Sequence, residues 1–352
     1  MAGVGNLPAR ATLGGERGAG QGAQSVDISY RKGVALVIVA ALMWSLMGLL
    51  IRLVGDVGTW QVLFYRSLGM IPVLFAVIAW RSGGAPLAAI RATGWAGLLG
   101  GAGLVLAFAG AIYAIQSTTV ANAVFMFSVT PLMTAVLGAV FLGEPVSRRA
   151  TIAIGVALVG IFVMVREGLS IGAGWGNLSA LASSAGFAVF TVLLRRQHVA
   201  DHTPAILIGA VLSVAVAATV ISATGTGFAV PPRGIAIAML MGAVILGVGI
   251  TIFALGGRAV PAAEMSLLAL VEVMLGPVWV WLFLGETASA GTFIGGAILL
   301  AAIAYQAFAD AEFSADRPGN SAALPQNPAV GSNQRTEIKQ ETIHRAAAEN
   351  AD

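Results

Sequence analysis

Three charged side chains lie inside long apolar stretches of this chain, where water cannot easily solvate them. Glu272 lies about 18 Å into the stretch at 260–284, counted at about 1.5 Å per helical residue. Arg66 lies about 9 Å and Glu264 about 6 Å from the nearer ends of their stretches. A charge near the centre of a membrane helix costs roughly 2.5–3.5 kcal/mol, so we expect these residues to have a function or a partner.

Glu272 is the leading candidate because it lies nearest the middle of its stretch. Its carboxylate could bind a substrate amine or a proton, since the sites of many carriers lie at that depth. An ion pair with Arg66 that holds two helices together is the alternative, and the two roles are compatible. Glu264 could act in gating or proton entry, or it could reach the membrane surface.

A hydrophobic unit occurs twice in the chain, 142 residues apart, once ending at Phe141–Pro145 and again at Phe283–Thr287. Polar residues recur at this offset as well. Of the matched residues, Asn122 is expected near the outer mouth and Glu264 near the inner mouth, where they could be paired gate elements; hydrogen bonding between helices is the alternative. The polar matches are Asn122 with Glu264 and Thr130 with Glu272.

Two prolines interrupt the hydrogen bonding expected in the stretches that carry these residues. Pro131 and Pro277 lack the backbone N–H that a helix uses, which frees a carbonyl oxygen one turn earlier. Such a carbonyl could bind a substrate or an ion, and a packing kink is the alternative. Trp44 and Tyr65 could line a cavity for an apolar part of a substrate, with packing in the core or against lipid as the alternative.

The residues that most enzymes and metal sites need are missing from the apolar stretches. The chain has no cysteine, which excludes disulfides, thiol catalysis and cysteine metal sites. His198 and His202 lie beside an arginine-rich loop, and His344 lies near the C-terminus. No zinc-protease, serine-hydrolase or P-loop motif occurs. We therefore expect no catalytic residues, no metal and no cofactor.

Composition indicates a membrane protein. Hydrophobic residues make up 58% of the 352 residues and charged residues 10%, against roughly 25% charged residues in soluble domains. Ten apolar stretches can each cross a bilayer as a helix, because open strands in lipid would leave backbone groups unpaired. The predicted fold class is an all-α integral membrane protein with ten transmembrane helices. The stretches are 33–53, 60–80, 94–115, 119–141, 149–165, 175–194, 204–223, 235–256, 260–284 and 289–308.

Five helices in each copy of the repeat would place the two copies upside down relative to each other. Repeat 1 is expected at 33–165 and repeat 2 at 175–308, as two inverted five-helix repeats. Many carriers build mirrored gates around one central site in this way. The first helices also match at an offset of 143, which sets Gly33, Trp44 and Arg52 against Gly176, Phe187 and Arg195.

Basic residues predict the orientation. With the N-terminus in the cytoplasm, nine basic residues flank the inner ends of the helices and three the outer ends, as the positive-inside rule requires. The polar segments 1–30 and 310–352 are then both cytoplasmic tails, and we expect them to be disordered. The inner set is Arg31, Lys32, Arg81, Arg91, Arg148, Arg149, Arg195, Arg196 and Arg258, and the outer set is Arg52, Arg166 and Arg233.

The doubled pattern resembles the EamA domain of the drug/metabolite transporter superfamily over about residues 33–308. This resemblance implies a carrier of small polar metabolites, often an exporter of amino acids or their derivatives. The chain departs from the family pattern after Glu272, where the helix proline follows about one turn later, at Pro277. The segments that carry the resemblance are Ala121–Pro131 with Leu142–Glu144, Pro261–Ser266 with Leu284–Glu286, Trp44–Ser45 and Phe64–Arg66.

The sequence thus predicts a secondary-active transporter, working as an exporter of a small organic metabolite such as an amino acid or derivative, by alternating access. A membrane enzyme would need clustered acids, histidines or a nucleophile at one depth. A non-transporting scaffold or receptor would need neither a buried acid nor mirrored halves. Abundant Arg, Ala and Gly are associated with GC-rich bacteria, which favours the bacterial cytoplasmic (inner) membrane. Expected partners are a small-molecule substrate and the lipid bilayer, with no nucleic acid, and a homodimer is left open.

Overall fold

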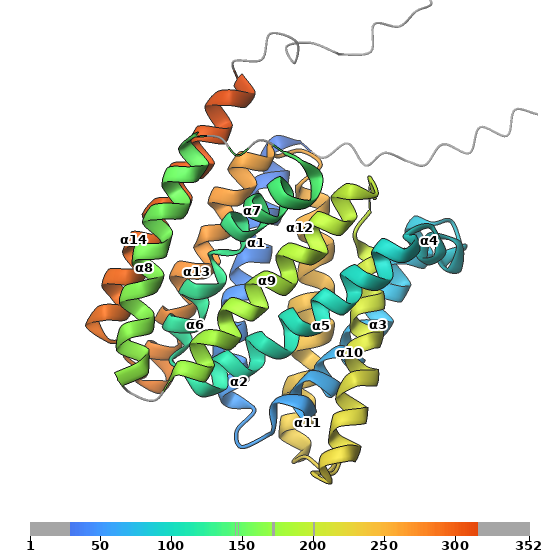
Figure 1. Ribbon diagram of the computed structural model, residues 1–352. Coiled ribbons are helices and arrows are strands. Elements are labelled where there is room, and N and C mark those ends of the chain that lie inside the picture. Colours follow the sequence, from blue (N-terminus) through green and yellow to red (C-terminus); the bar gives the residue numbers. More distant parts are fainter. Residues whose placement is uncertain (1–28, 145, 147, 171–172, 200, 316–352) are drawn as a thin grey trace, which may run out of the picture.

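The computed structural model describes residues 29–144, 146, 148–170, 173–199 and 201–315, and their regular structure is entirely helical (Figure 1). The predicted all-α class is confirmed for these residues. The helices are α1 (Tyr30–Ser45), α2 (Met47–Leu53), α3 (Thr59–Arg81), α4 (Pro86–Ala92), α5 (Gly94–Ser117), α6 (Val120–Phe127), α7 (Thr130–Leu142), α8 (Arg148–Ser170), α9 (Gly174–Arg196), α10 (Thr203–Thr224), α11 (Pro232–Leu240), the π-helix η1 (Met241–Val248), α12 (Gly249–Gly256), α13 (Ala262–Leu284) and α14 (Ala290–Ala315).

Most of these helices are long and apolar enough to cross a bilayer. Within the described residues, eight segments meet both criteria, and α13 and α14 contribute shorter apolar stretches at Leu268–Leu284 and Ala290–Tyr305. Three of the eight segments combine consecutive helices, namely α1 with α2, α6 with α7, and α11 with η1 and α12. The arrangement of ten spans as two inverted repeats stays a prediction. The predicted tails lie largely outside the described residues, and α14 continues to Ala315.

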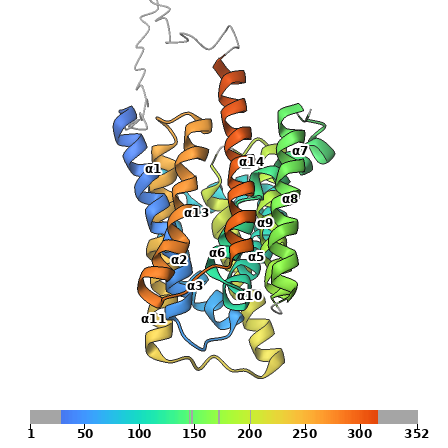
Figure 2. The same ribbon diagram turned by 90° about the vertical axis from the view of Figure 1, so that its left-hand side faces the viewer.

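The helices form a bundle with two distinct ends (Figure 2). At the upper end of that view α1 begins and α7 and α14 end, whereas α2 ends and α11 begins at the lower end. Within the bundle, α5 packs against α9 and α10, α3 packs against α10 and η1, and α1 packs against α12 and α13. The α8–α14 pair lies along one side, as both views show.

Glycines bring helix backbones into direct contact at several crossings. A Cβ atom on Gly186 of α9 would lie 2.5 Å from the carbonyl oxygen of Gly103 on α5. The same holds between α8 and α14, where a Cβ atom on Gly295 would lie 2.6 Å from the carbonyl oxygen of Gly160. Small residues are the usual means of packing helices in lipid, because apolar burial gives no preference for helix contact over lipid contact.

Two spanning segments are interrupted near their middles. Leu46 separates α1 from α2, and Ser128 and Val129 separate α6 from α7. A third segment changes to a π-helix in η1, between α11 and α12. Irregular turns inside membrane helices are frequent at functional sites, so these three places point to where the site lies.

The glycine contacts predict unequal effects of one substitution at two helical positions. Gly186→Ala should lower the thermal unfolding midpoint in detergent, because the added methyl forces α5 and α9 apart at a cost of about 1–3 kcal/mol. Gly155→Ala is the matched control, since a Cβ atom there has no neighbour within 4 Å and alanine favours a helix over glycine. Equal midpoints for the two variants would contradict this account of the packing.

Candidate functional site

The predicted site residues lie at three depths of the bundle. Glu264 contacts the start of α1, which lies at the upper end of Figure 2. Asn122 is in the first turn of α6, beside the end of α2 at the lower end, and Tyr65 contacts the segment before α11, which begins at that end. Glu272 and Thr130 lie between these, in α13 and at the interruption between α6 and α7. The structure therefore places the matched residues Asn122 and Glu264 towards opposite ends, whereas the matched residues Thr130 and Glu272 both lie between them.

Glu272 lies on a face of α13 that is turned towards the bundle interior. One turn later on that face is buried Gly276, where a Cβ atom would lie 3.5 Å from the side chain of Val124 on α6 and 3.8 Å from the carbonyl oxygen of Ser45 on α1. Residues four apart share a helix face. Glu272, which is half-buried, is thus directed to the region between α1 and the α6–α7 segment.

Arg66 is buried on α3, with 3% of its surface exposed. The Cζ atom of its guanidinium lies 4.7 Å from the centre of the Phe108 ring, a cation–π contact. The ion pairs among the described residues do not include Arg66 or Glu272. Their helices pack on different neighbours, because α13 lies against α1, α6 and α14 while α3 lies against α10, α11 and η1. The alternative of a Glu272–Arg66 ion pair is not realised.

Pro131 lies in the first turn of α7, where a missing N–H is least costly. The carbonyl that it leaves free, that of Phe127, accepts a hydrogen bond from Thr130 Oγ1 at 2.6 Å. Ser184 Oγ also lies 3.4 Å from this oxygen. This carbonyl is therefore already occupied by the protein. Pro277 lies within α13, which runs through it without interruption.

In the lower part, Asn122 takes part in a buried polar cluster. Its Nδ2 donates to Thr118 Oγ1 at 3.1 Å and to Asn177 Oδ1. The sequence analysis did not predict Asn177 of α9 as a partner. Its position as an asparagine inside an apolar stretch was the feature that could have identified it. Both asparagines are at most 3% exposed, so the cluster joins α6 to α9 inside the bundle.

The aromatic candidates have packing partners. Tyr65 donates its hydroxyl proton to the Phe228 carbonyl at 2.8 Å, which ties α3 to the segment before α11. Trp44 packs against Phe253 with ring centres 5.0 Å apart, and its buried Nε1 has no hydrogen-bond partner. A Cβ atom on Gly249 would lie 2.7 Å from this nitrogen, so glycine makes room for the ring.

At the upper end, Glu264 accepts a hydrogen bond from Tyr30. The distance from Tyr30 Oη to Glu264 Oε2 is 2.6 Å, and Tyr30 is exposed. This contact joins the first turn of α13 to the first turn of α1. Glu264 thus bridges two helices close to the surface.

Two ion pairs that the sequence analysis did not predict join the halves at opposite ends. At the lower end, Arg52 Nε lies 2.9 Å from Glu286 Oε2, and the other Glu286 oxygen accepts the backbone N–H of Val120 at 2.6 Å. At the upper end, Arg195 Nη2 lies 2.7 and 2.8 Å from the two oxygens of Glu144. The matched arginines and the matched glutamates were both visible in the sequence, but their pairing needs the fold.

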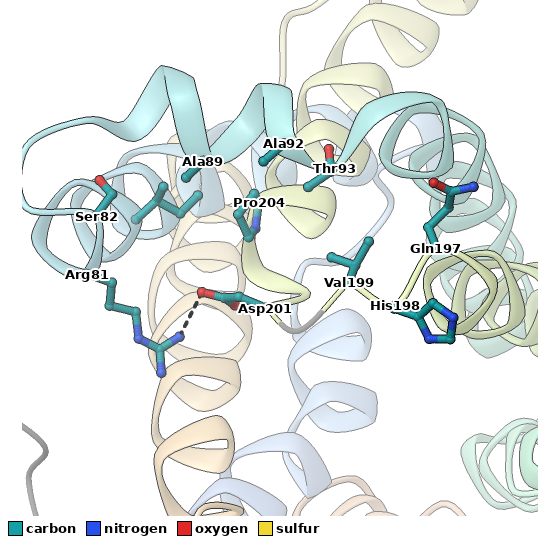
Figure 3. A pocket seen from close by; sticks show the side chains of 11 residues that line it. Arg81, Ser82, Ala89, Ala92, Thr93, Gln197, His198, Val199, Asp201 and Pro204 are labelled. Atoms are coloured by element: carbon teal, nitrogen blue, oxygen red, sulfur yellow. Dashed lines mark hydrogen bonds and ion pairs between the residues drawn. The ribbon is translucent and has the colours of Figure 1, made fainter.

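The cavity drawn in Figure 3 contains none of the predicted site residues. It measures about 380 Å³ and is bounded by the end of α3, by α4 and by the segment between α9 and α10. Arg81 lies 3.5 Å from Asp201 there. Nearby, burial lowers the pKa of His202, which packs against Phe190. Among the described residues, no group of three His, Asp or Glu side chains could hold a metal.

Comparison with known proteins gives a family for one part of the chain and a fold for most of it. Residues 31–166 match the family model described as the EamA-like transporter family. Solved structures with a similar fold include one described as "Crystal structure of protein", which is 17% identical, covers 82% of this chain and 100% of its own, and has a TM-score of 0.58. At that identity the similarity shows the fold alone. No curated protein matches.

The asparagine cluster predicts a measurable coupling between α6 and α9. Asn122→Ala and Asn177→Ala should each lower stability, and the double variant should lose less than the sum of the two. The expected coupling energy is about 0.6 kcal/mol, up to about 1.7 kcal/mol, as for other hydrogen bonds between membrane helices. A double-mutant cycle of unfolding in mixed detergent measures it, and strictly additive losses would show that the two amides act independently.

Proposed function

Residues 31–166 form an EamA-like transporter family domain, and we propose that the chain is a secondary-active carrier that exports a small organic metabolite by alternating access. The match of residues 31–166 to this family supports a multi-pass membrane transporter over an enzyme. An amino acid or an amino-acid derivative is the proposed substrate. In the proposed orientation both tails are cytoplasmic, so the upper end of Figure 2 faces the cytoplasm.

The observation that carries this proposal is the pair of ion pairs at opposite ends of the bundle. Arg52 and Arg195 match in the repeat, and so do Glu144 and Glu286. Each arginine binds the glutamate of the other half, at the lower end in one case and the upper end in the other. Mirrored contacts between halves are what two alternating gates require, because each can open while the other stays closed.

The two glutamates are held in equivalent local structures. Gly143 and Gly285 both end their helices with positive φ, at 69° and 67°. The backbone N–H of Glu144 then donates to a carbonyl six residues earlier, and that of Glu286 does the same. Both follow the usual C-terminal cap of a helix, which aims each carboxylate at the partner half.

We call the Arg52–Glu286 ion pair, together with α2 and α6, the lower gate. The interruptions at Leu46 and Ser128–Val129 are places where this gate can bend. Below them lie α2 and α6, which pack closely, since a Cβ atom on Gly48 would meet the Val120 side chain. Arg52 lies in the last turn of α2, and its Nη2 also donates to the Thr118 carbonyl at 2.8 Å, beside the start of α6. We propose that α2 and α6 move together about Leu46 and the Ser128–Val129 turn.

Glu272 is the proposed substrate or proton site between the gates. It lies on the face of α13 that is directed to both interruptions, and the described residues give its carboxylate no ion-pair partner. A lone carboxylate at that depth must be hydrated, protonated or bound to a ligand. Thr130, its match in the first half, instead donates its hydroxyl proton to the Phe127 carbonyl, across the interruption between α6 and α7.

Breaking one of the two ion pairs should make the middle of the bundle, around the α6–α7 turn, more accessible to reagents from that side of the membrane only. The chain has no cysteine, so Thr130→Cys provides a single reporter thiol at the α6–α7 turn. Arg52→Gln should speed labelling by a membrane-impermeant thiosulfonate about 2- to 5-fold from the lower side, as expected if a partly exposed ion pair is worth about 0.5–1 kcal/mol. Arg195→Gln should speed labelling from the upper side by a similar factor.

Oriented vesicles give access to each side separately, and Arg91→Gln serves as a surface control. In Arg52→Gln and in Arg195→Gln, labelling from the opposite side should slow. A protein molecule that is open to one side is closed to the other, so a larger fraction of one conformation leaves a smaller fraction of the other. Faster labelling from both sides, or no change from either, would overturn alternating access.

Glu272→Gln should abolish export without preventing insertion into the membrane. Mass spectrometry of the medium, compared among cells with wild-type protein, Glu272→Gln and empty vector, should show a metabolite enriched by the wild type alone. A proton role further predicts that the variant loses the pH dependence of transport, whereas a ligand role predicts weaker binding at every pH.

Membrane abundance of Glu272→Gln is the control for insertion. Wild-type enrichment that persists unchanged in this variant would make Glu272 a packing residue. No enrichment by the wild type over empty vector would favour the scaffold or receptor alternative over a carrier.

A further inference from the structure

Arg66 is the one side chain in the described residues whose charged group is buried with two hydrogen-bond donors unused. Its Nε and Nη2 atoms are both buried and have no partner. These two nitrogens form one edge of the planar guanidinium. That edge is the one that binds a carboxylate or phosphate through two parallel hydrogen bonds.

The position of this edge is set by its surroundings. The Cζ atom of the guanidinium lies over the Phe108 ring, 4.7 Å from the ring centre. Behind it, the backbone of α3 is pressed against η1, because a Cβ atom on Gly242 would lie 1.7 Å from the Arg66 carbonyl oxygen. One turn along α3, a Cβ atom on Gly69 would lie 2.4 Å from the Met239 carbonyl oxygen. The backbone that carries Arg66 is thus fixed, and the Phe108 ring lies beside its guanidinium before any ligand arrives.

A buried guanidinium needs an acceptor, and the described residues supply none. No carboxylate lies within 4.0 Å of Arg66, and no backbone carbonyl accepts from it. Arginine keeps its proton at any physiological pH, so it cannot escape the cost of burial by becoming neutral. Two free donors on one edge, at a fixed place beside a π-helix, have the form of a binding site for an anion.

We propose that Arg66 binds an anionic group of the transported metabolite, a carboxylate or a phosphate, through its Nε–Nη2 edge. The proposal rests on the proposed carrier function and adds the substrate class. Because Glu272 and Arg66 do not pair, an acidic group can bind at Arg66 while Glu272 remains free to take a proton or an amine.

A test with small anions does not require the substrate to be known. The thermal unfolding midpoint of purified full-length protein is measured in about 100 mM sodium acetate and, as the control, in the same concentrations of acetamide and sodium chloride. The midpoint should be about 2 °C higher in acetate than in the control. Methyl phosphate in place of acetate distinguishes the two anion classes. The wild-type difference should vanish in Arg66→Gln and persist in Arg91→Gln, a change of an exposed arginine on α4.

Arg66→Lys and Phe108→Leu keep the test decisive if the glutamine variant folds poorly. Lysine keeps the charge but not the two-nitrogen edge, so the acetate shift should fall by at least half. Phe108→Leu leaves the arginine without its aromatic support and should weaken the shift similarly. An acetate shift of equal size in wild type, Arg66→Gln and Arg66→Lys, or none over acetamide in the wild type, would overturn the anion site.

The export measurement separates this inference from the carrier function. Metabolites enriched by the wild type and lost in Arg66→Gln should all carry a carboxylate or phosphate. If the wild type exports only uncharged or cationic compounds, the carrier stands and the anion site falls. If it exports nothing, the carrier function fails, while the acetate shift still decides whether Arg66 binds an anion.

Discussion

Direct contact between helix backbones is the constraint on which the rest of this structure depends. Lipid tails are as apolar as leucine, so helices in a bilayer associate through close packing rather than through burial of apolar surface. Glycine permits that packing between α5 and α9 and between α8 and α14. A still tighter contact, between Gly242 of η1 and the Arg66 carbonyl of α3, also places Arg66, which among the described residues is the one buried arginine without a hydrogen-bond or ion-pair partner. Helix packing and the candidate site are therefore set by the same contacts.

The cost of charge in hydrocarbon explains how the ionisable residues are distributed. Arg52, Glu286, Arg195 and Glu144 lie at helix ends, where they pair and remain partly exposed. Such pairs contribute little net stability, which suits contacts that must form and break during a transport cycle. Glu272 and Arg66 lie deeper and have no ion-pair partner among the described residues. Charges that stay unpaired at that depth are the ones available to a ligand.

The matched halves differ in a way that bears on how a carrier would work. The first half carries both mid-helix interruptions, at Leu46 and at Ser128–Val129. The positions that match them by sequence, Val189 and Leu270–Val271, lie within the continuous helices α9 and α13. In the proposed mechanism, α2 and α6 of the first half move about these interruptions, and the second half has no matching interruption in α9 or α13.

By itself, the sequence determined the class of protein, the helical fold, most helix bounds and the family of residues 31–166. Those features follow from local properties, namely hydrophobic length, glycine and proline positions, and short motifs. It also showed which residues are costly to bury. What it could not supply was their partners: Asn122 with Asn177, Arg52 with Glu286, and Arg66 with Phe108 alone. Those pairings join segments between 42 and 234 residues apart, and only the tertiary packing of the helices decides which faces meet.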